Sequence, residues 1–223
     1  KEKISAKHPY GDWLKENLLP LKEVPYTGNT TPVEAEPFIK RLQAFGYTEE
    51  DIKTLITPMS TLGKEAIGSM GTDTPLAVLS NKPQLLYNYF KQLFAQVTNP
   101  PLDGIREEIV TDTSMSVGSD ANIFDVIPAH AKKLNIQNPI ISNEDLDKIK
   151  FIEHDDFKSK SVNALYVANE GNNGLERALE ELLKRVKKEV EDGANIIILS
   201  DRGINKDMAP IPMLLACAFV HHG

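Results

Sequence analysis

A turn rich in glycine and small polar residues spans residues 68–74 and reads GSMGTDT. Such residues could cradle a phosphate, because glycine permits unusual backbone angles and Ser, Thr and Asp side chains bond nearby amides. A phosphate loop needs a lysine after its last glycine, and a dinucleotide fingerprint needs a third glycine; neither is present. The composition therefore favours a rigid turn, held by Thr72 and Asp73, over a phosphate site.

A second candidate for chemistry is LSDRG at residues 199–203, which directly follows the apolar run ANIIILS. If this run is a strand of a parallel sheet, Ser200, Asp201 and Arg202 lie at its carboxyl end, where α/β proteins place their ligands. The alternative interpretation is an ion pair between Asp201 and Arg202 that fixes the loop. The sequence allows both.

The cysteine and histidine residues indicate neither a metal site nor a thiol nucleophile. Cys217 is the single cysteine, so it can form no internal disulfide and no multi-thiolate or iron–sulfur site. Its apolar context, MLLACAFV, predicts a buried and unreactive thiol. His221 and His222 are adjacent, and on a helix they point about 100° apart.

The final third of the chain must supply the sheet that positions LSDRG. Residues 161–168 are typical of a strand and residues 194–200 of a fully buried one. The segment between them predicts a helix that ends at Gly193, because its apolar residues follow the helical period. These are Leu175, Ala178, Leu179, Leu182, Leu183, Val186 and Val190. Strand, helix and strand predict a parallel unit with a right-handed crossover.

Residues 82–97, KPQLLYNYFKQLFAQV, predict a helix whose apolar and aromatic residues form one stripe. A stripe at this spacing is typical of a core or an interface rather than of a base-stacking surface. The sequence TNPP follows and fixes Thr98 and Asn99, since a residue before proline is held in extended geometry. Two polar groups are therefore expected at the end of an apolar helix.

The N-terminal part predicts mainly helices. DWLKENLLPLKEVP is typical of a short amphipathic helix stopped by Pro20, and a polar linker follows it. Two further short helices are expected on either side of Gly46, the second with Thr48 as its N-cap. We expect residues 1–65 to form a mostly helical lead-in to the rest of the chain.

Residues 66–223 are expected to form an α/β core. Residues 111–122 are the most loop-like segment of the chain. A short strand is expected around Ile140 and Ile141, followed by a helix capped by Ser142 or Asn143. The predicted class is α/β, with a partial parallel sheet flanked by helices.

The composition excludes several classes of partner. Charged residues make up 26% of the 223 residues, the formal net charge is −7, and the two signs are interspersed. A nucleic-acid partner is not expected, because such partners are held by clustered Lys and Arg. The sequence contains no apolar run of the roughly 20 residues that cross a bilayer, and residues 1–13 lack a signal-peptide core. We expect a cytoplasmic protein without a membrane partner.

The sequence resembles the central domain of the large subunit of glutamate synthase over nearly its whole length. The stretches that carry this resemblance are AKHPYGDWLKENLLPL, QAFGYTEEDIKTLITPM, GSMGTDTPLAVLSNKPQLLYNYFKQLFAQVTNPPLDGIREE and DGANIIILSDRGINKDMAPIPMLLACAFVHH. In this family a glutaminase domain precedes the central domain, and a flavin-binding barrel with an iron–sulfur cluster and a β-helix follow it. The family's central domain resembles an incomplete (β/α) barrel or a Rossmann-like layer.

The resemblance implies a connecting role without a catalytic residue on this chain. Glutaminase and FMN-binding synthase domains of the same enzyme would be its partners, and FMN and an iron–sulfur cluster would lie on the synthase domain. Ammonia would pass between the two active sites through a channel. By resemblance, Met70 and Thr98 are the first candidates for its lining. Neighbouring candidates are Ser69, Thr72, Asp73 and Asn99.

One segment departs from the family's pattern. TDTSMSVGSDANIFDV, residues 111–126, stands where a segment richer in glycine and leucine is expected, so its contacts with partners are open. Two other hypotheses remain beside the connecting domain. The chain could be a stand-alone α/β protein that binds phosphate or flavin at the edge formed by residues 200–203, or a free-standing interaction module. The residues that select pyridine nucleotide or ferredoxin as electron donor would lie elsewhere.

Overall fold

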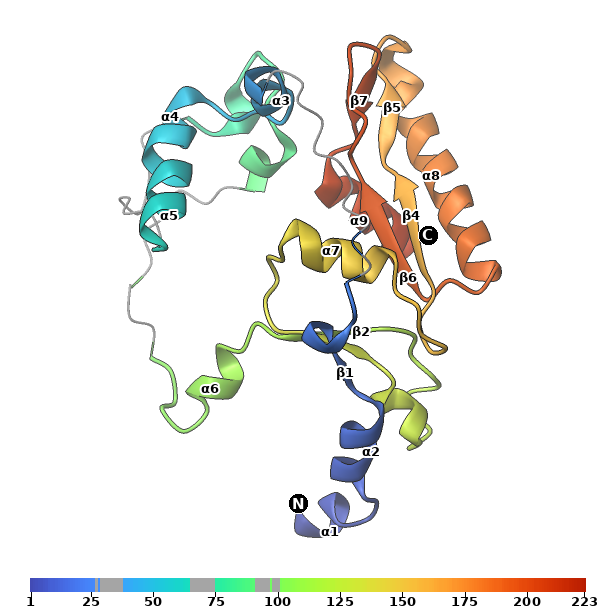
Figure 1. The fold of residues 1–223 in the computed structure, drawn as a ribbon. Coiled ribbons are helices and arrows are strands. Elements are labelled where there is room, and N and C mark those ends of the chain that lie inside the picture. The colour runs from blue at the N-terminus through green and yellow to red at the C-terminus, as the bar shows by residue number, and fades with distance from the viewer. Residues whose placement is uncertain (27, 29–37, 65–74, 91–96, 98–100) are drawn as a thin grey trace.

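The structure is a computed structural model, and it describes residues 1–26, 28, 38–64, 75–90, 97 and 101–223. Its described strands form three small sheets, which are ordered β1-β3-β2, β4-β6 and β5-β7 (Figure 1). The α/β class is confirmed, whereas an incomplete barrel or a single Rossmann-like layer stays a prediction. No helix in the described part of the chain has the length and hydropathy to cross a membrane.

The predicted parallel unit is present at the C-terminal end. Strand β4 (Ser159–Asn163) pairs in parallel with β6 (Ile196–Ser200), and α8 (Gly174–Glu191) connects them. Helix α8 is followed by Gly193, whose φ of +91° suits a glycine. The prediction that β6 is fully buried was wrong, since only Ile196 is buried. A strand with one described neighbour is covered less completely than the central strand of a larger sheet.

The single strand expected over residues 161–168 is split at Ala164. The amide of Ala164 donates to the carbonyl of Ser200 at 2.7 Å, whereas its own carbonyl accepts from the amide of Ile211 at 2.9 Å. The chain therefore leaves β6 and continues as β5 (Leu165–Val167), which is antiparallel to β7 (Met208–Pro210). Strand β7 has too few residues to show an alternating pattern, and the sequence did not predict it.

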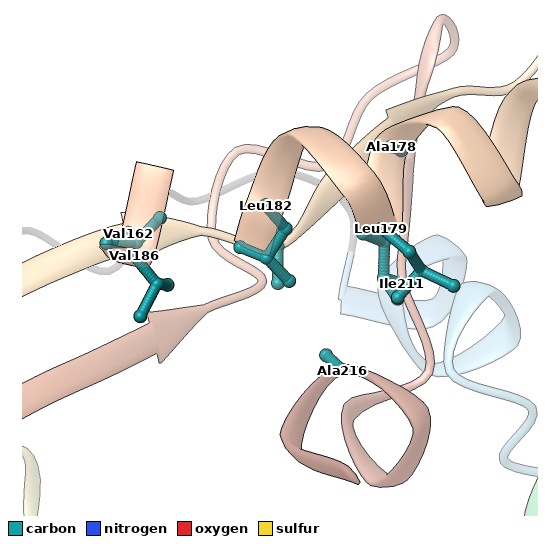
Figure 2. Packing of buried hydrophobic residues seen from close by; sticks show 8 residues of the cluster. Val162, Ala178, Leu179, Leu182, Val186, Ile211 and Ala216 are labelled. Atoms are coloured by element: carbon teal, nitrogen blue, oxygen red, sulfur yellow. The ribbon is translucent and has the colours of Figure 1, made fainter. Parts of the chain in front are cut away.

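Helices α8 and α9 (Met213–His222) enclose the larger core against β4. Figure 2 shows Leu182 of α8 lying among the apolar side chains of this core. Ala216 is the buried residue of α9. The prediction that Cys217 is buried was wrong, because the residue is exposed. Helix α9 is apolar around its whole circumference, so the sequence gives no sign of which face packs, and Cys217 lies about 100° from Ala216.

A second core lies around a three-stranded sheet in the lower part of Figure 1. Strand β3 (Leu134–Ile136) is central, parallel to β1 (Leu19–Pro20) and antiparallel to β2 (Met115–Val117). The short strand predicted at Ile140 and Ile141 was wrong in position: β3 lies earlier in the chain, and Ile140 is 85% exposed. The predicted loop over residues 111–122 contains β2.

Buried Lys133 fixes the end of this loop. Its ammonium group donates to the carbonyls of Gly118 at 3.0 Å and Ser119 at 2.8 Å, and it pairs with Asp120. The hydrogen bond from Lys133 is the main cause that lowers the pKa of the Asp120 carboxyl. Charge-assisted hydrogen bonds from Lys133 therefore hold residues 118–120, which belong to the segment predicted to be a loop.

The N-cap predictions were confirmed. Thr48 Oγ1 accepts from the amide of Asp51 at 3.1 Å, and the Asp51 carboxylate accepts from the amide of Thr48 at 2.9 Å, which completes a capping box. Helix α7 (Asn143–Lys150) has Ser142 as its N-cap, whose hydroxyl accepts from the amide of Asp145 at 3.0 Å. Gly46 separates two helices as predicted, with a φ of +77°.

The remaining elements are short. The helix expected over residues 82–97 is wrong at its start, since residues 82–85 are not helical and a 3-10 helix runs over Leu86–Phe90. Residues 91–96 lie outside the described residues. The α-helices not yet given are α1 Glu2–Ser5, α2 Tyr10–Asn17, α3 Phe38–Ala44, α4 Glu49–Asp51, α5 Thr57–Leu62 and α6 Glu107–Val110. A π-helix at Ile52–Ile56 joins α4 to α5. The other 3-10 helices are Leu21–Glu23, Ala77–Leu79, Pro128–Ala131 and Gly171–Asn173.

Candidate functional site

The residues first expected to line an ammonia channel lie outside the described part of the chain. This holds for Met70 and Thr98 and for their four predicted neighbours. Those neighbours are Ser69, Thr72, Asp73 and Asn99. Their role in a channel therefore stays a prediction, and the described geometry concerns two other places: the carboxyl edge of β6 and a cavity beside α7.

At the edge of β6, Ser200 and Arg202 are engaged in structural contacts. The hydroxyl of Ser200 accepts from the amide of Arg202 at 3.3 Å, and the Arg202 guanidinium donates to the side-chain carbonyl of Asn143 at 3.3 Å. Gly203 follows with a φ of +96°, which lets the chain turn back toward β7. The loop after β6 is thus fastened to the first residue of α7.

The alternative ion pair between Asp201 and Arg202 is not among the contacts of these described residues. Arg202 reaches across to Asn143, a contact between residues 59 positions apart in the sequence. The sequence could not predict this partner, because the pairing depends on how α7 packs on β4. The edge therefore acts as a junction between two elements, which the bond from Arg202 to Asn143 joins.

The geometry assembles no nucleophile with a base at this edge. Ser200 has no histidine among its described hydrogen-bond partners, and His130 and His154 bond elsewhere. Within the described residues, no group of three or more His, Cys, Asp or Glu side chains is placed to hold a metal ion. Catalysis by general base and activated hydroxyl requires both groups within hydrogen-bond reach of each other.

A cavity of about 440 Å³ lies where β1 and β3 end and α7 begins. Sequence reasoning missed it, because its walls come from three separate segments, residues 18–22, 135–142 and 145–148. Ser142 lines this cavity, and the next residue, Asn143, accepts the bond from Arg202. The first turn of α7 therefore lies between the cavity and the edge of β6.

Two of the charged groups that line the cavity, Asp145 and Lys148, are paired. Lys148 Nζ lies 3.0 Å from Asp145 Oδ1 and 3.7 Å from Glu144 Oε1. The hydrogen bond from Lys148 lowers the pKa of the Asp145 carboxyl, and the same bond raises the pKa of the Lys148 ammonium. Both groups are thereby held in their charged forms near neutral pH, which suits neither for proton transfer.

The uncharged polar groups of the cavity are also satisfied in part. The Gln137 side chain donates to the Asn135 side chain at 2.6 Å, and the Ser142 hydroxyl donates to the Asp145 carboxylate at 3.1 Å. Apolar walls come from Leu18, Leu21 and Ile136. Lys22 also lines the cavity, and no ion pair joins it to another described residue. The cavity therefore combines apolar walls with one ion pair and one further cation.

Comparison with known proteins identifies close sequence relatives over the whole chain. The family model described as "Glutamate synthase central domain" matches residues 40–223. The glutamate synthase [NADPH] large chain of Bacillus subtilis is 39% identical over 224 residues, 99% of this chain and 14% of the relative. The glutamate synthase [NADH] of Schizosaccharomyces pombe is 35% identical over 233 residues, 100% of this chain and 11% of the relative.

A ferredoxin-dependent relative is equally similar. The ferredoxin-dependent glutamate synthase 2 of Synechocystis sp. is 38% identical over 226 residues, 100% of this chain and 14% of the relative. The chain thus spans only 11–14% of the length of these three relatives. Identity is similar whether the relative's name specifies NADPH, NADH or ferredoxin, so the matched stretch does not separate these donors.

Proposed function

The chain belongs to the family of glutamate synthase central domains, and we propose that it is the non-catalytic connecting domain of such an enzyme. It would link a glutaminase domain to an FMN-binding synthase domain of the same polypeptide. The synthase domain would carry FMN and an iron–sulfur cluster, and this chain would hold neither. Its contribution would be to position the two active sites and to line part of the path between them.

One observation carries this proposal: the relatives match 99–100% of the chain, yet the chain spans only 11–14% of them. Most residues of the named enzymes therefore lie outside the matched stretch. In the described part of the chain, Arg202 at the β6 edge bonds Asn143, and Asp145 and Lys148 in the cavity bond each other. A domain whose polar groups are engaged in this way suits a structural role better than proton transfer.

The chemistry of ammonia explains why such an enzyme needs a shielded path. In water at neutral pH ammonia is mostly protonated, and an ammonium ion pays a large desolvation penalty on entering an apolar passage. Ammonia released from glutamine must therefore travel as the neutral molecule to the synthase site. There it would add to 2-oxoglutarate, and the imine would be reduced to glutamate.

We assign the first share of this path to Met70 and Thr98, with Ser69, Thr72, Asp73 and Asn99 beside them. Met70 would supply an apolar wall, and the Thr98 hydroxyl could accept or donate one hydrogen bond without adding charge. Thr98 is followed in the sequence by Asn99 and two prolines, and a proline restricts both its own backbone and that of the residue before it. The uncharged side chains of Met70 and Thr98 suit a passage that must keep ammonia neutral.

Alanine substitutions in the intact enzyme test this assignment. Met70→Ala and Thr98→Ala should lower the glutamate formed per glutamine hydrolysed, because ammonia would escape to the solvent. The measurement is the ratio of the two rates, together with the free ammonia released. Synthesis from added ammonia should change less, since external ammonia does not depend on the entrance of the path.

Met59→Ala and Thr61→Ala are matched controls, because they remove the same atoms from exposed positions of α5. They should leave the ratio unchanged. An unchanged ratio in Met70→Ala and in Thr98→Ala as well would contradict the assignment of these residues. A connecting role without a channel contribution would then be the surviving part of the proposal.

A further inference from the structure

A tight turn at residues 122–125 presents two large apolar side chains to the outside. Ile123 is 76% exposed and Phe124 is 87% exposed. The turn lies within residues 111–126, the segment that departs from the family pattern. Single exposed apolar residues are common on protein surfaces, but two adjacent ones on an ordered turn are a candidate contact site.

Hydrogen bonds within the turn fix its shape. The Asn122 side-chain carbonyl accepts from the amide of Phe124 at 3.2 Å, and the Asn122 backbone carbonyl accepts from the amide of Asp125 at 2.9 Å. The Asn122 amide group also donates to the Asp125 carboxylate at 3.0 Å. The backbone that carries Ile123 and Phe124 is therefore bonded on both sides.

His130 fastens this turn to the body of the protein. Its Nε2 lies 2.8 Å from the carbonyl of Asp125 and 3.1 Å from the carbonyl of Asn122, so this nitrogen carries the proton and donates. His130 belongs to the 3-10 helix Pro128–Ala131, which packs against α2. A turn held in this way loses little conformational freedom when a partner covers it, which favours binding.

Aromatic residues of the N-terminal segment lie at the same end of the molecule. The rings of His8, Tyr10 and Trp13 are in mutual contact, with centroids 5.4–5.6 Å apart. Helix α2 carries Tyr10 and Trp13 and contacts the 3-10 helix that holds the turn, as the yellow-green segment beside α2 in Figure 1 shows. The turn is therefore connected to α2 through the 3-10 helix that holds it.

We propose that Ile123 and Phe124 dock into an apolar pocket on a neighbouring domain of the same polypeptide. The length of the relatives argues for this occupant, since the chain spans only 14% of the Bacillus subtilis relative. The proposal rests on the proposed function, because it needs a multidomain enzyme around this chain. It adds a specific contact, made by a turn on which the channel assignment does not depend.

Thiol protection in the full-length enzyme tests the proposal. Phe124→Cys and, separately, Ile123→Cys are alkylated with iodoacetamide in native buffer and in urea, and the modified peptide is quantified by mass spectrometry. Lys187→Cys, on an exposed position of α8, calibrates an open thiol. The quantity compared is the labelling rate in urea divided by the rate in native buffer. If these side chains are buried, this ratio should be at least about tenfold larger at residues 124 and 123 than at residue 187.

Dilution separates the possible occupants. Docking within one polypeptide is independent of concentration, so the protection should persist over about a hundredfold dilution. Protection that falls on dilution indicates a second copy or another protein and overturns the proposal, as does labelling as fast as at residue 187. If the cysteines at 123 and 124 are labelled freely but Met70→Ala and Thr98→Ala lower the glutamate formed per glutamine hydrolysed, only the docking inference fails. If the cysteines are protected but those two variants leave that ratio unchanged, only the channel assignment fails.

Discussion

Two regions of the chain use their apolar residues in opposite ways. Residues 131–223 contain most of both cores, including the fully buried Leu134, Leu182 and Ile211. In residues 38–110, none of the described residues is buried. Large apolar side chains are nevertheless frequent there and exposed, among them Phe38, Ile39, Leu62, Val78, Leu79 and Phe90.

The difference follows from what each region packs against. Helix α8 lies on β4 and against α9, so its apolar stripe meets a second layer. The contacts of α5 and of the π-helix at Ile52–Ile56 are mainly with their immediate neighbours in sequence. A helix stabilises a fold through its apolar stripe only when another element covers it. The described residues between 38 and 110 therefore receive little cover from the rest of the described chain.

The largest expected effect contrasts one leucine from each region. Leu182→Ala should lower the free energy of unfolding by about 2–5 kcal/mol, because it opens a cavity in the core. Leu79→Ala should change it by less than about 0.5 kcal/mol, since Leu79 is 72% exposed. Urea unfolding of both variants measures the two values. Equal losses would show that the two regions share one core, and the comparison would fail.

Hydrogen exchange should rank the same two regions. Amides in the middle of α8 are expected to exchange only on global unfolding, whereas those of α3 and α5 exchange through local opening. We expect protection in α8 to exceed that in α3 and α5 by at least about 100-fold, measured by mass spectrometry of peptides. Similar protection in both regions would contradict the comparison. Higher protection of α3 and α5 in a full-length enzyme would support cover by another domain.

The sequence predicts the long helix α8 better than the short strand β3 for a physical reason. Helix α8 is long enough for its 3.6 period to be visible, and Gly193 marks its end. Strand β3, by contrast, has three residues, too few to show an alternation, so the apolar pair Ile140–Ile141 looked more strand-like. Pairing with β1 and β2 decides where β3 lies, and such long-range pairing is not visible in a local pattern.

The candidate site was less predictable than the fold. Ser200 and Arg202 were correctly placed at the carboxyl end of β6, but the partner Asn143 lies 59 residues away. The cavity beside α7 depends on three segments that no local motif connects. The exposed position of Cys217 depends on which face of an apolar helix meets α8. The channel residues around Met70 and Thr98 come from resemblance and stay a prediction.

Helix caps give a smaller contrast between the two regions. Ser142→Ala and Thr48→Ala each remove one hydroxyl that accepts a hydrogen bond from a backbone amide. Ser142→Ala should lower the global free energy of unfolding by about 1 kcal/mol, because α7 contributes Ile149 to a core. Thr48→Ala should lower helical content locally and change global unfolding by less than half as much. Circular dichroism and urea unfolding measure the two effects, and equal global losses would contradict the expected difference.

The smallest expected effect is a pH dependence that arises at α7. The pKa of Asp145 is lowered in the folded protein, first by the hydrogen bond from Lys148, so the unfolded chain binds a proton more readily. The stabilisation is therefore complete above the unfolded pKa of about 3.9 and is lost as pH falls through the folded value. The free energy of unfolding is measured at several pH values between about 6 and 2.5. The values for the wild type and for Asp145→Asn should converge only below about pH 4. Lys148→Met removes the other partner of the same ion pair, so its free energy of unfolding should converge with that of the wild type in the same pH range. A constant difference across the series would show that the Asp145–Lys148 pair does not stabilise the folded state.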